Sequence, residues 1–228
     1  MIKEKPIVTI RRGFDRPDPA LVDALRGAMT GHVVDSMSGR GALDYRIKPI
    51  EVSRSAICGT ALTVKAAPGD NMAVNAALDV AKPGDIIVCA TDSFVETAVV
   101  GDLLLGMMKN VGAGAFVTDG LIRDLIGVRG VGLPVFAMGV TPNSPTGGGT
   151  GTVGLPIMIG GVHVSPGDVI VGDEDGVVVV PQAELSQVIE TLKEVRALEA
   201  EAEAKVKAGQ DRSPKFTALQ EAGKVLEI

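Results

Sequence analysis

The sequence is poor in the residues that bind soft metals. Its 228 residues include two cysteines, Cys58 and Cys89, and two histidines, His32 and His163, and no C-x-x-C spacing occurs. A zinc site is therefore hard to assemble from this chain. Both cysteines lie in apolar segments that are typical of strands, so we expect buried free thiols that behave as small hydrophobic residues.

Long apolar runs and clusters of positive charge are also absent. The longest unbroken aliphatic stretch, residues 177–180, is far too short to span a membrane. Residues 1–6 carry charges, but no apolar segment of a secretory signal follows them. The formal net charge is −6, without the basic cluster that would favour nucleic acid as a partner. We therefore expect a cytoplasmic protein that binds neither a membrane nor nucleic acid.

Strand-like and helix-like segments alternate along the chain, which predicts an α/β fold with a largely parallel or mixed sheet. Residues 18–30 have the apolar periodicity of a helix, residues 57–66 that of a strand, and Asp70 is placed to cap a helix that reaches about Val80. Three Pro-Gly-Asp tripeptides, beginning at residues 68, 83 and 166, predict turns. The length allows one large domain or two small ones.

Residues 141–154 form the one long stretch without periodicity and predict a loop over or beside a site. Within it, Gly149, Gly151 and Gly154 have the Gly-x-Gly-x-x-Gly spacing of a dinucleotide fingerprint. We reject that interpretation, because an extended apolar segment follows where the fingerprint requires a helix. There is no Walker lysine either, so the sequence offers no cradle for a nucleotide.

Asp102, followed after 20 residues by Arg123 and Asp124, is the most informative pattern. Each of the two positions lies where a strand gives way to a helix, and these ends collect ligands in open α/β sheets. Two carboxylates suit a hard cation, and an arginine suits an anionic substrate. A helix cap at Asp102 and a surface ion pair at Arg123 and Asp124 remain as the alternative.

The C-terminal region, residues 182–208, predicts a helix rich in alanine and glutamate. Leu185, Val188, Leu192 and Val195 follow one apolar stripe, and its next member is either Leu198 or Glu199. If it is Glu199, a carboxylate faces a packing surface. The alternative is a solvated glutamate in a charged tail.

Several motifs together resemble the RraA-like family over roughly residues 20 to 200. They are Ala67-Pro68-Gly69-Asp70-Asn71, Lys82-Pro83-Gly84-Asp85-Ile86-Ile87-Val88, Gly101-Asp102-Leu103-Leu104, Thr118-Asp119-Gly120-Leu121-Ile122-Arg123-Asp124, and Pro166-Gly167-Asp168 with the later Asp173-Glu174-Asp175-Gly176 run. The catalytic branch of that family contains divalent-metal-dependent 4-hydroxy-4-methyl-2-oxoglutarate and 4-carboxy-4-hydroxy-2-oxoadipate aldolases. The family also contains inhibitors of a ribonuclease.

The resemblance implies an αββα sandwich like the phosphohistidine swivelling domain. Residues 1–181 would form the catalytic domain, and residues 182–228 a C-terminal helix and tail that contact other subunits of a homotrimer or homohexamer. The implied activity is retro-aldol cleavage of a 4-hydroxy-2-oxo di- or tricarboxylate to pyruvate and a second oxo acid, with oxaloacetate decarboxylation as a side activity.

The resemblance also implies a role for each residue of the pattern. Asp124 would bind the divalent cation, Mg²⁺ or Mn²⁺, and Arg123 would contact the pyruvyl oxygen. Asp102 would orient water on the ion, with Glu199 of a neighbouring subunit as a further catalytic carboxylate. Backbone donors of the turn formed by Gly101, Asp102, Leu103 and Leu104 would bind the substrate carboxylate.

Two other functions compete with this one. Lys65 could form a Schiff base in a metal-independent aldolase, although strand alternation places it with Thr63 and favours a solvent-facing or carboxylate-binding role. A regulator that binds a ribonuclease would need no catalytic set. Asn75 and Arg54 are candidates for contacts with the distal end of the substrate.

Overall fold

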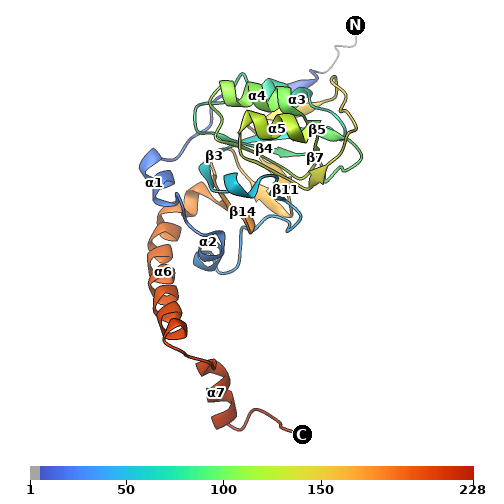
Figure 1. Cartoon of the computed structure of the whole chain (residues 1–228). Helices are drawn as coiled ribbons and strands as arrows, with labels where there is room; N and C mark the ends of the chain where they lie inside the picture. Colours follow the sequence, from blue (N-terminus) through green and yellow to red (C-terminus); the bar gives the residue numbers. More distant parts are fainter. Residues whose placement is uncertain (1–5) are drawn as a thin grey trace.

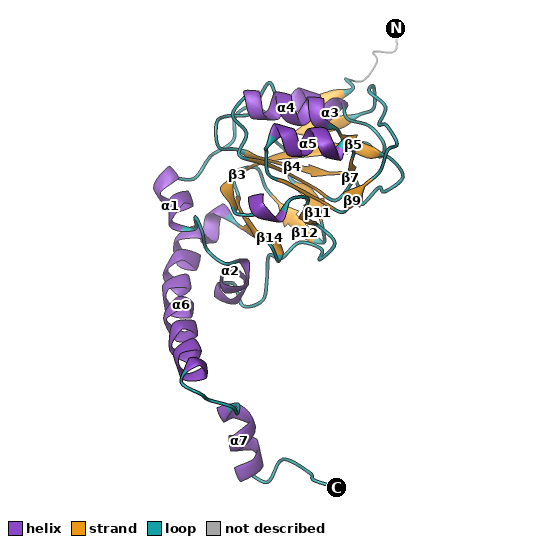
Figure 2. Ribbon diagram, in the orientation of Figure 1, coloured by secondary structure: helices purple, strands orange, loops and turns teal. Residues whose placement is uncertain are grey.

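A mixed β-sheet crosses the middle of the computed structural model, which describes residues 6–228 (Figures 1 and 2). Its main path follows the order β1-β10-β3-β4-β6-β8-β2. These strands are β1 Val8–Ile10, β10 Gly151–Val153, β3 Ile57–Ala66, β4 Ile86–Ala90, β6 Ala115–Thr118, β8 Val135–Ala137 and β2 Lys48–Pro49. β3, β4, β6 and β8 are parallel, whereas β10 and β2 are antiparallel to their neighbours β3 and β8. The prediction of a strand over residues 57–66 is confirmed.

Three helices cover one face of this sheet (Figure 2). They are α3 Met72–Ala77, α4 Asp102–Asn110 and α5 Leu125–Val131. Side chains that alternate along the strands, such as Leu62, Ile87 and Phe116, pack against Leu105 and Met108 of α4 in a buried core. Parallel strands with an apolar residue at nearly every position require such cover on both faces, because neither face is polar enough for water.

A second β layer covers the opposite face. It consists of the antiparallel pairs β11 Ile157–Ile159 with β12 Val162–Val164, and β13 Val169–Asp173 with β14 Gly176–Val180. The outer face of β13 and β14 is covered in turn by α1 Pro19–Ala24, α2 Thr30–Ser36 and α6 Leu185–Lys207. The layers are therefore helix, sheet, sheet, helix, and the expected α/β fold with an αββα sandwich is confirmed.

The prediction of one helix over residues 18–30 is wrong. α1 ends at Ala24, and Gly27 follows with a φ of +71° in the left-handed region, so the chain turns before α2 begins at Thr30. Helix α3 is also shorter than the predicted helix that reached Val80, and Asp70 accepts a hydrogen bond from the Met72 N–H at 2.7 Å instead of being the N-cap itself.

The aspartates of the three Pro-Gly-Asp turns are buried. Asp70, Asp85 and Asp168 are only 3%, 3% and 6% exposed. Each carboxylate accepts backbone N–H groups, for example Lys82 N–H on Asp85 at 2.9 Å and Ser165 N–H on Asp168 at 2.8 Å. Hydrogen bonds of this kind compensate for the loss of hydration and hold the turn in one shape.

Both cysteines are free thiols, as predicted. Cys89 is fully buried in β4, and Cys58 is half-buried in β3. Burial raises the pKa of the Cys58 thiol to about 11 and raises that of Cys89 further. Neither thiol is therefore ionised near neutral pH. No helix of residues 6–228 is long and apolar enough to cross a membrane, and of the N-terminal segment that was examined for a secretory signal only Pro6 is described.

The C-terminal helices extend away from the sandwich as an arm (Figure 1). The first part of α6, preceded by a 3₁₀ turn at Gln182–Glu184, buries Leu185, Val188 and Leu192 against α1 and α2. Beyond this contact Leu198 is 67% exposed and Glu199 is also exposed, and helix α7, Pro214–Glu221, has no buried residue. The apolar stripe of α6 thus continues past the end of its packing surface within this chain.

Candidate functional site

A small parallel sheet brings the two halves of the site together. It consists of β5 Ala98–Val100, β7 Leu121–Ile122 and β9 Gly139–Val140 in the order β5-β7-β9. β5 leads directly to Gly101 and Asp102, and β7 leads directly to Arg123 and Asp124. The Arg123 N–H continues the pairing by donating to the Val100 carbonyl at 3.0 Å. Residues that are 20 positions apart in sequence are therefore neighbours at the same edge.

Gly101 lies in direct contact with the second half of the site. A Cβ atom at this position would lie 2.4 Å from Asp124 Oδ2 and 3.2 Å from Arg123 Cγ, so no larger residue fits without displacing them. Asp124 itself has φ +60° and ψ 45° and is the N-cap residue of α5. A non-glycine residue in this left-handed region is strained, and such strain is concentrated at functional sites.

Asp102 is the first residue of α4, whose N-cap is Gly101. One carboxylate oxygen, Oδ1, accepts a hydrogen bond from the Leu103 N–H at 2.8 Å. The other, Oδ2, lies over the backbone of α5, because a Cβ atom on Gly127 would be only 2.0 Å from it. Asp102 is therefore more than a simple helix cap: Gly127 leaves room for its carboxylate between α4 and α5. The sequence pattern gave no reason to select Gly127.

The Arg123 side chain is held from two sides. Its Nε donates to Asp124 Oδ2 at 3.0 Å, and its NH1 donates to the hydroxyl of Ser144. The Arg123 and Asp124 side chains are 34% and 39% exposed, so this ion pair contributes little to the stability of the fold. The guanidinium is held in place while part of it still faces solvent.

These residues line one pocket of about 350 Å³. Six of the lining residues were candidates in the sequence, and three were missed. The candidates are Gly101, Asp102, Leu103, Leu104, Arg123 and Asp124, and the residues that were missed are Asn71, Ser144 and Pro145. Ser144 and Pro145 belong to the aperiodic segment that was expected beside a site. Asn71 follows a Pro-Gly-Asp turn, but nothing in the pattern indicates that this turn faces Arg123.

The start of α4 supplies polar backbone to the pocket. The N–H groups in the first turn of a helix have no partners within the helix, and the helix dipole favours an anion there. The Asp102 carboxylate occupies the N–H of Leu103, which leaves the N–H groups of Asp102 and Leu104 for an anionic ligand. This nine-residue helix and Arg123 therefore present donors to the same space.

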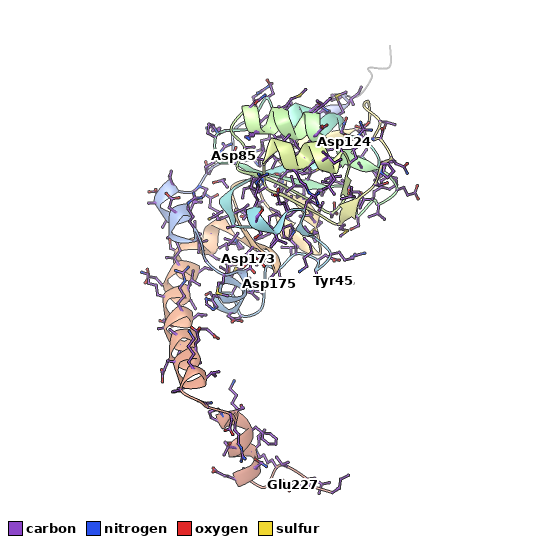
Figure 3. All side chains as sticks on the ribbon, in the orientation of Figure 1. Tyr45, Asp85, Asp124, Asp173, Asp175 and Glu227 are labelled. Atoms are coloured by element: carbon purple, nitrogen blue, oxygen red, sulfur yellow. The ribbon has the colours of Figure 1, made fainter. Side chains whose placement is uncertain are left out.

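The other candidates lie outside this pocket. Lys65 is in β3, where its ammonium pairs with the Asp92 carboxylate, and it lines a separate pocket. Asn75 donates to Asn71 Oδ1 at 3.3 Å without lining the pocket, and Arg54 donates to the Arg129 carbonyl at 2.9 Å. Glu199 lies on the arm, which leaves the sandwich well away from Asp124 (Figures 1 and 3).

The donor set suits a hard cation that keeps most of its water. In residues 6–228 there is no group of three or more histidine, cysteine, aspartate or glutamate side chains arranged to hold a metal. The pocket offers two carboxylates, Asp102 and Asp124, with no sulfur or imidazole ligand. Mg²⁺ is commonly bound through one or two carboxylates with several waters retained, whereas zinc requires a fuller set of protein ligands. The residues present therefore fit Mg²⁺ or Mn²⁺, with Asp124 as the more exposed ligand.

Comparison with known proteins gives a consistent family. The family described as "RraA-like: Aldolase/RraA" matches residues 19–179. A protein of Halalkalibacterium halodurans named "Putative 4-hydroxy-4-methyl-2-oxoglutarate aldolase" is 38% identical over 176 residues, which cover 77% of this chain and 83% of that protein. An uncharacterized protein of Methanocaldococcus jannaschii is 33% identical over 72% of this chain and 80% of its own length.

A solved structure extends the comparison to the fold. It is that of Streptomyces coelicolor RraAS2, described as an unusual member of the RNase ES inhibitor RraA protein family, and it has a TM-score of 0.75 and 27% identity. The similarity covers 83% of this chain and 100% of the RraAS2 chain. Together with the match over residues 19–179, these findings show that the chain belongs to the RraA-like family.

Proposed function

We propose that this protein is a divalent-metal-dependent aldolase that cleaves a 4-hydroxy-2-oxo di- or tricarboxylate to pyruvate and a second oxo acid. The observation that carries the proposal is the meeting of Asp102, Arg123 and Asp124 with the N-terminus of α4 in one pocket. The similarity to the aldolase-named protein of Halalkalibacterium halodurans supports the reaction class.

The reaction needs a place for electrons. Cleavage of the C3–C4 bond leaves an electron pair on C3, and this pair is stabilised only when it delocalises onto the C2 oxygen as an enolate. A divalent cation bound at Asp124 supplies Lewis-acid stabilisation of that oxygen. Arg123 adds a fixed positive charge beside it, and a donor that is preorganised toward developing charge is a large catalytic contribution. The same enolate chemistry permits oxaloacetate decarboxylation as a side activity.

The remaining residues bind and move protons. The N–H groups at the start of α4 bind the C1 carboxylate of the substrate, since a helix N-terminus favours an anion. Leu103 and Leu104 supply these donors together with Gly101 and Asp102. The Asp102 carboxylate, fixed by the Leu103 N–H at 2.8 Å, orients water and accepts the proton of the C4 hydroxyl through it.

Glu199 belongs to this site through a second copy of the chain. Within one chain Glu199 is exposed on the arm and does not line the pocket. Residues 182–228 then act as the oligomer contact of a homotrimer or homohexamer, with residues 1–181 as the catalytic domain. The apolar side chain of Leu198, which is 67% exposed beside Glu199, is a surface that such a contact would bury.

A second candidate function follows from the similarity to RraAS2. A regulator of that type would bind a ribonuclease and would not require the pocket residues. The strained Asp124 backbone and the close approach of Gly101 favour the enzyme, because a protein-binding surface has no need of either. The Schiff-base alternative has less support, since Lys65 is paired with Asp92 outside the pocket.

The test is pyruvate release from a panel of 4-hydroxy-2-oxo acids and from oxaloacetate. We expect turnover with Mg²⁺ or Mn²⁺, loss of turnover in excess EDTA, and loss in Asp124→Asn. Sodium borohydride with pyruvate should not inactivate the wild type, whereas trapping at Lys65 would establish the Schiff-base route. A stable complex with a ribonuclease, in a wild type that turns over no oxo acid, would establish the regulator instead.

A further inference from the structure

One wall of the pocket is a loop without regular structure. Residues 141–150, called here the 141–150 loop, connect β9 to β10 and contribute Ser144 and Pro145 to the pocket lining. The opposite walls come from the starts of α4 and α5. The Ser144 hydroxyl accepts a hydrogen bond from Arg123 NH1 across the pocket. The position of the Arg123 guanidinium therefore depends on where this loop lies.

The buried carboxylate of Asp70 holds the loop down. Its Oδ2 accepts three hydrogen bonds from the loop, from the Thr146 hydroxyl at 3.0 Å and from the N–H groups of Gly148 and Gly149 at 2.8 Å each. Its Oδ1 accepts from the Met72 N–H at 2.7 Å. Asp70 is only 3% exposed, and no lysine or arginine of residues 6–228 pairs with it.

The electrostatics of Asp70 agree with this geometry. Burial acts to raise the pKa of the Asp70 carboxyl, but the N–H groups of Met72, Gly149 and Gly148 and the Thr146 hydroxyl outweigh it, so that the pKa lies below its usual value. The carboxylate is therefore charged at neutral pH. A buried carboxylate whose charge is balanced by donors of one loop stabilises that particular conformation of the loop.

Asp70 also connects the loop to a second pocket residue. Asn71, the next residue in the chain, lines the pocket, and its N–H donates to the Thr146 carbonyl at 3.1 Å. At its other end the loop is held by the Asn143 carbonyl, which accepts the Ala98 N–H at 3.0 Å, just before β5 leads to Gly101. The loop is thus attached to both sides of the pocket.

We propose that Asp70 is a positioning residue, which fixes the 141–150 loop so that Ser144 orients the Arg123 guanidinium for the substrate. Asp70 does not line the pocket and acts only through the loop and Asn71. The role in turnover rests on the proposed aldolase function. The structural part of the proposal, the control of Arg123 by Asp70 through Ser144, does not.

The structural part is tested without turnover by hydrogen exchange. In Asp70→Asn the amide cannot accept at both oxygens, so at least one of the four hydrogen bonds becomes a clash of donors. We expect peptides of residues 141–150 to exchange about tenfold faster or more than in the wild type. Asp168→Asn is the matched control, because Asp168 is 6% exposed and accepts backbone N–H groups in an equivalent turn away from the pocket.

A chemical probe reports on Arg123 itself. Phenylglyoxal modifies arginine side chains, and peptide mass spectrometry measures the rate at Arg123 alone. We expect this rate to rise severalfold in both Asp70→Asn and Ser144→Ala, and to remain at the wild-type value in Asp168→Asn. Wild-type exchange of the loop in Asp70→Asn, or an unchanged modification rate in either variant, overturns the proposal. If Asp70→Asn does not fold, Thr146→Ala removes one loop contact and takes its place in both measurements.

Kinetics complete the test for the enzyme. With oxaloacetate as the substrate, Asp70→Asn and Ser144→Ala should lower kcat by about tenfold or more while KM changes little, because the carboxylate-binding start of α4 is intact and Arg123 is not. A kcat equal to that of the wild type would overturn the positioning role. A wild type without turnover would instead refute the proposed function, and exchange and modification would still decide the role of Asp70.

Discussion

Replacing Gly127 by alanine should lower turnover severely without unfolding the protein. Gly127 lies inside α5, where alanine normally stabilises a helix by about 0.5–1 kcal/mol relative to glycine. Here the added Cβ would lie 2.0 Å from Asp102 Oδ2, whereas ordinary contacts begin at 3.4 Å. The carboxylate must therefore move by about 1.4 Å, the difference between these two distances.

Two effects of similar size then oppose each other in the stability. Turning the Asp102 side chain away from its preferred rotamer costs on the order of 0.5–1.5 kcal/mol, which offsets the gain in helix propensity. We expect the free energy of unfolding of Gly127→Ala to lie within about 1 kcal/mol of the wild type. The effect on catalysis is larger, since a displacement of about 1 Å at a catalytic group can cost roughly 100-fold in rate.

The assay combines thermal unfolding with kcat/KM for metal-dependent pyruvate release. Gly130→Ala is the matched control, because Gly130 lies in the same helix and a Cβ there meets no atom within 4 Å. It should gain about 0.5–1 kcal/mol and keep full activity. In an Asp102→Ala background Gly127→Ala should stabilise as Gly130→Ala does. A Gly127→Ala variant with wild-type kcat/KM would refute the assignment of Asp102 to catalysis.

The remaining predictions concern the metal, the arginine, the subunit contact and pH. Asp124→Asn should abolish Mg²⁺ binding in calorimetry and lower kcat/KM more than about 100-fold; retained binding would remove Asp124 as the ligand. Arg123→Lys should lose nearly as much activity as Arg123→Ala, roughly 2–4 kcal/mol in transition-state stabilisation, because an ammonium cannot engage two oxygens in one plane; a lysine variant with normal kcat/KM would make Arg123 structural. Once subunit exchange is verified by mass spectrometry, mixing inactive Glu199→Ala with inactive Asp124→Ala should restore some turnover, and mixed oligomers without activity would exclude a role for Glu199 across the interface. Because the pKa of Asp70 is lower in the folded chain, its stabilising effect is complete above the ordinary aspartate pKa of about 3.9 and is lost as the pH falls through the lowered value, so the 141–150 loop should lose protection from hydrogen exchange only below about pH 4 and not in Asp70→Asn.

The sequence predicted the layers better than the small elements that build the site. Strand β3 and the apolar runs after the Pro-Gly-Asp turns carry their own pattern, so they could be placed from periodicity. The strands β5 and β7 are three and two residues long, which is too short for any pattern. The approach of Asp102 to Arg123 and Asp124 was therefore expected from the ends of longer strands, whereas the small sheet actually produces it.

The residues that were missed depend on contacts between distant segments. Ser144 reaches the pocket because Asp70 binds Thr146, 76 positions away in sequence, and no local pattern contains that contact. The helix predicted over residues 18–30 failed for a different reason, since apolar periodicity continued across Gly27, whose left-handed backbone ends the helical path. The role of Glu199 stays a prediction, because the contact that would test it lies outside a single chain.

The small sheet has a consequence for how the chain tolerates changes in length. β5 and β7 meet in one short register, Ala98 opposite Leu121 and Val100 opposite Ile122. An insertion within either strand would shift this register and move Gly101 away from Asp124, because successive strand residues point to opposite sides. The connection between α4 and β6, residues 111–114, lies outside that register. Extra residues there would lengthen the path from Asp102 to Arg123 in sequence while leaving their separation in space unchanged, so related enzymes can keep the site without keeping the interval of 20 residues.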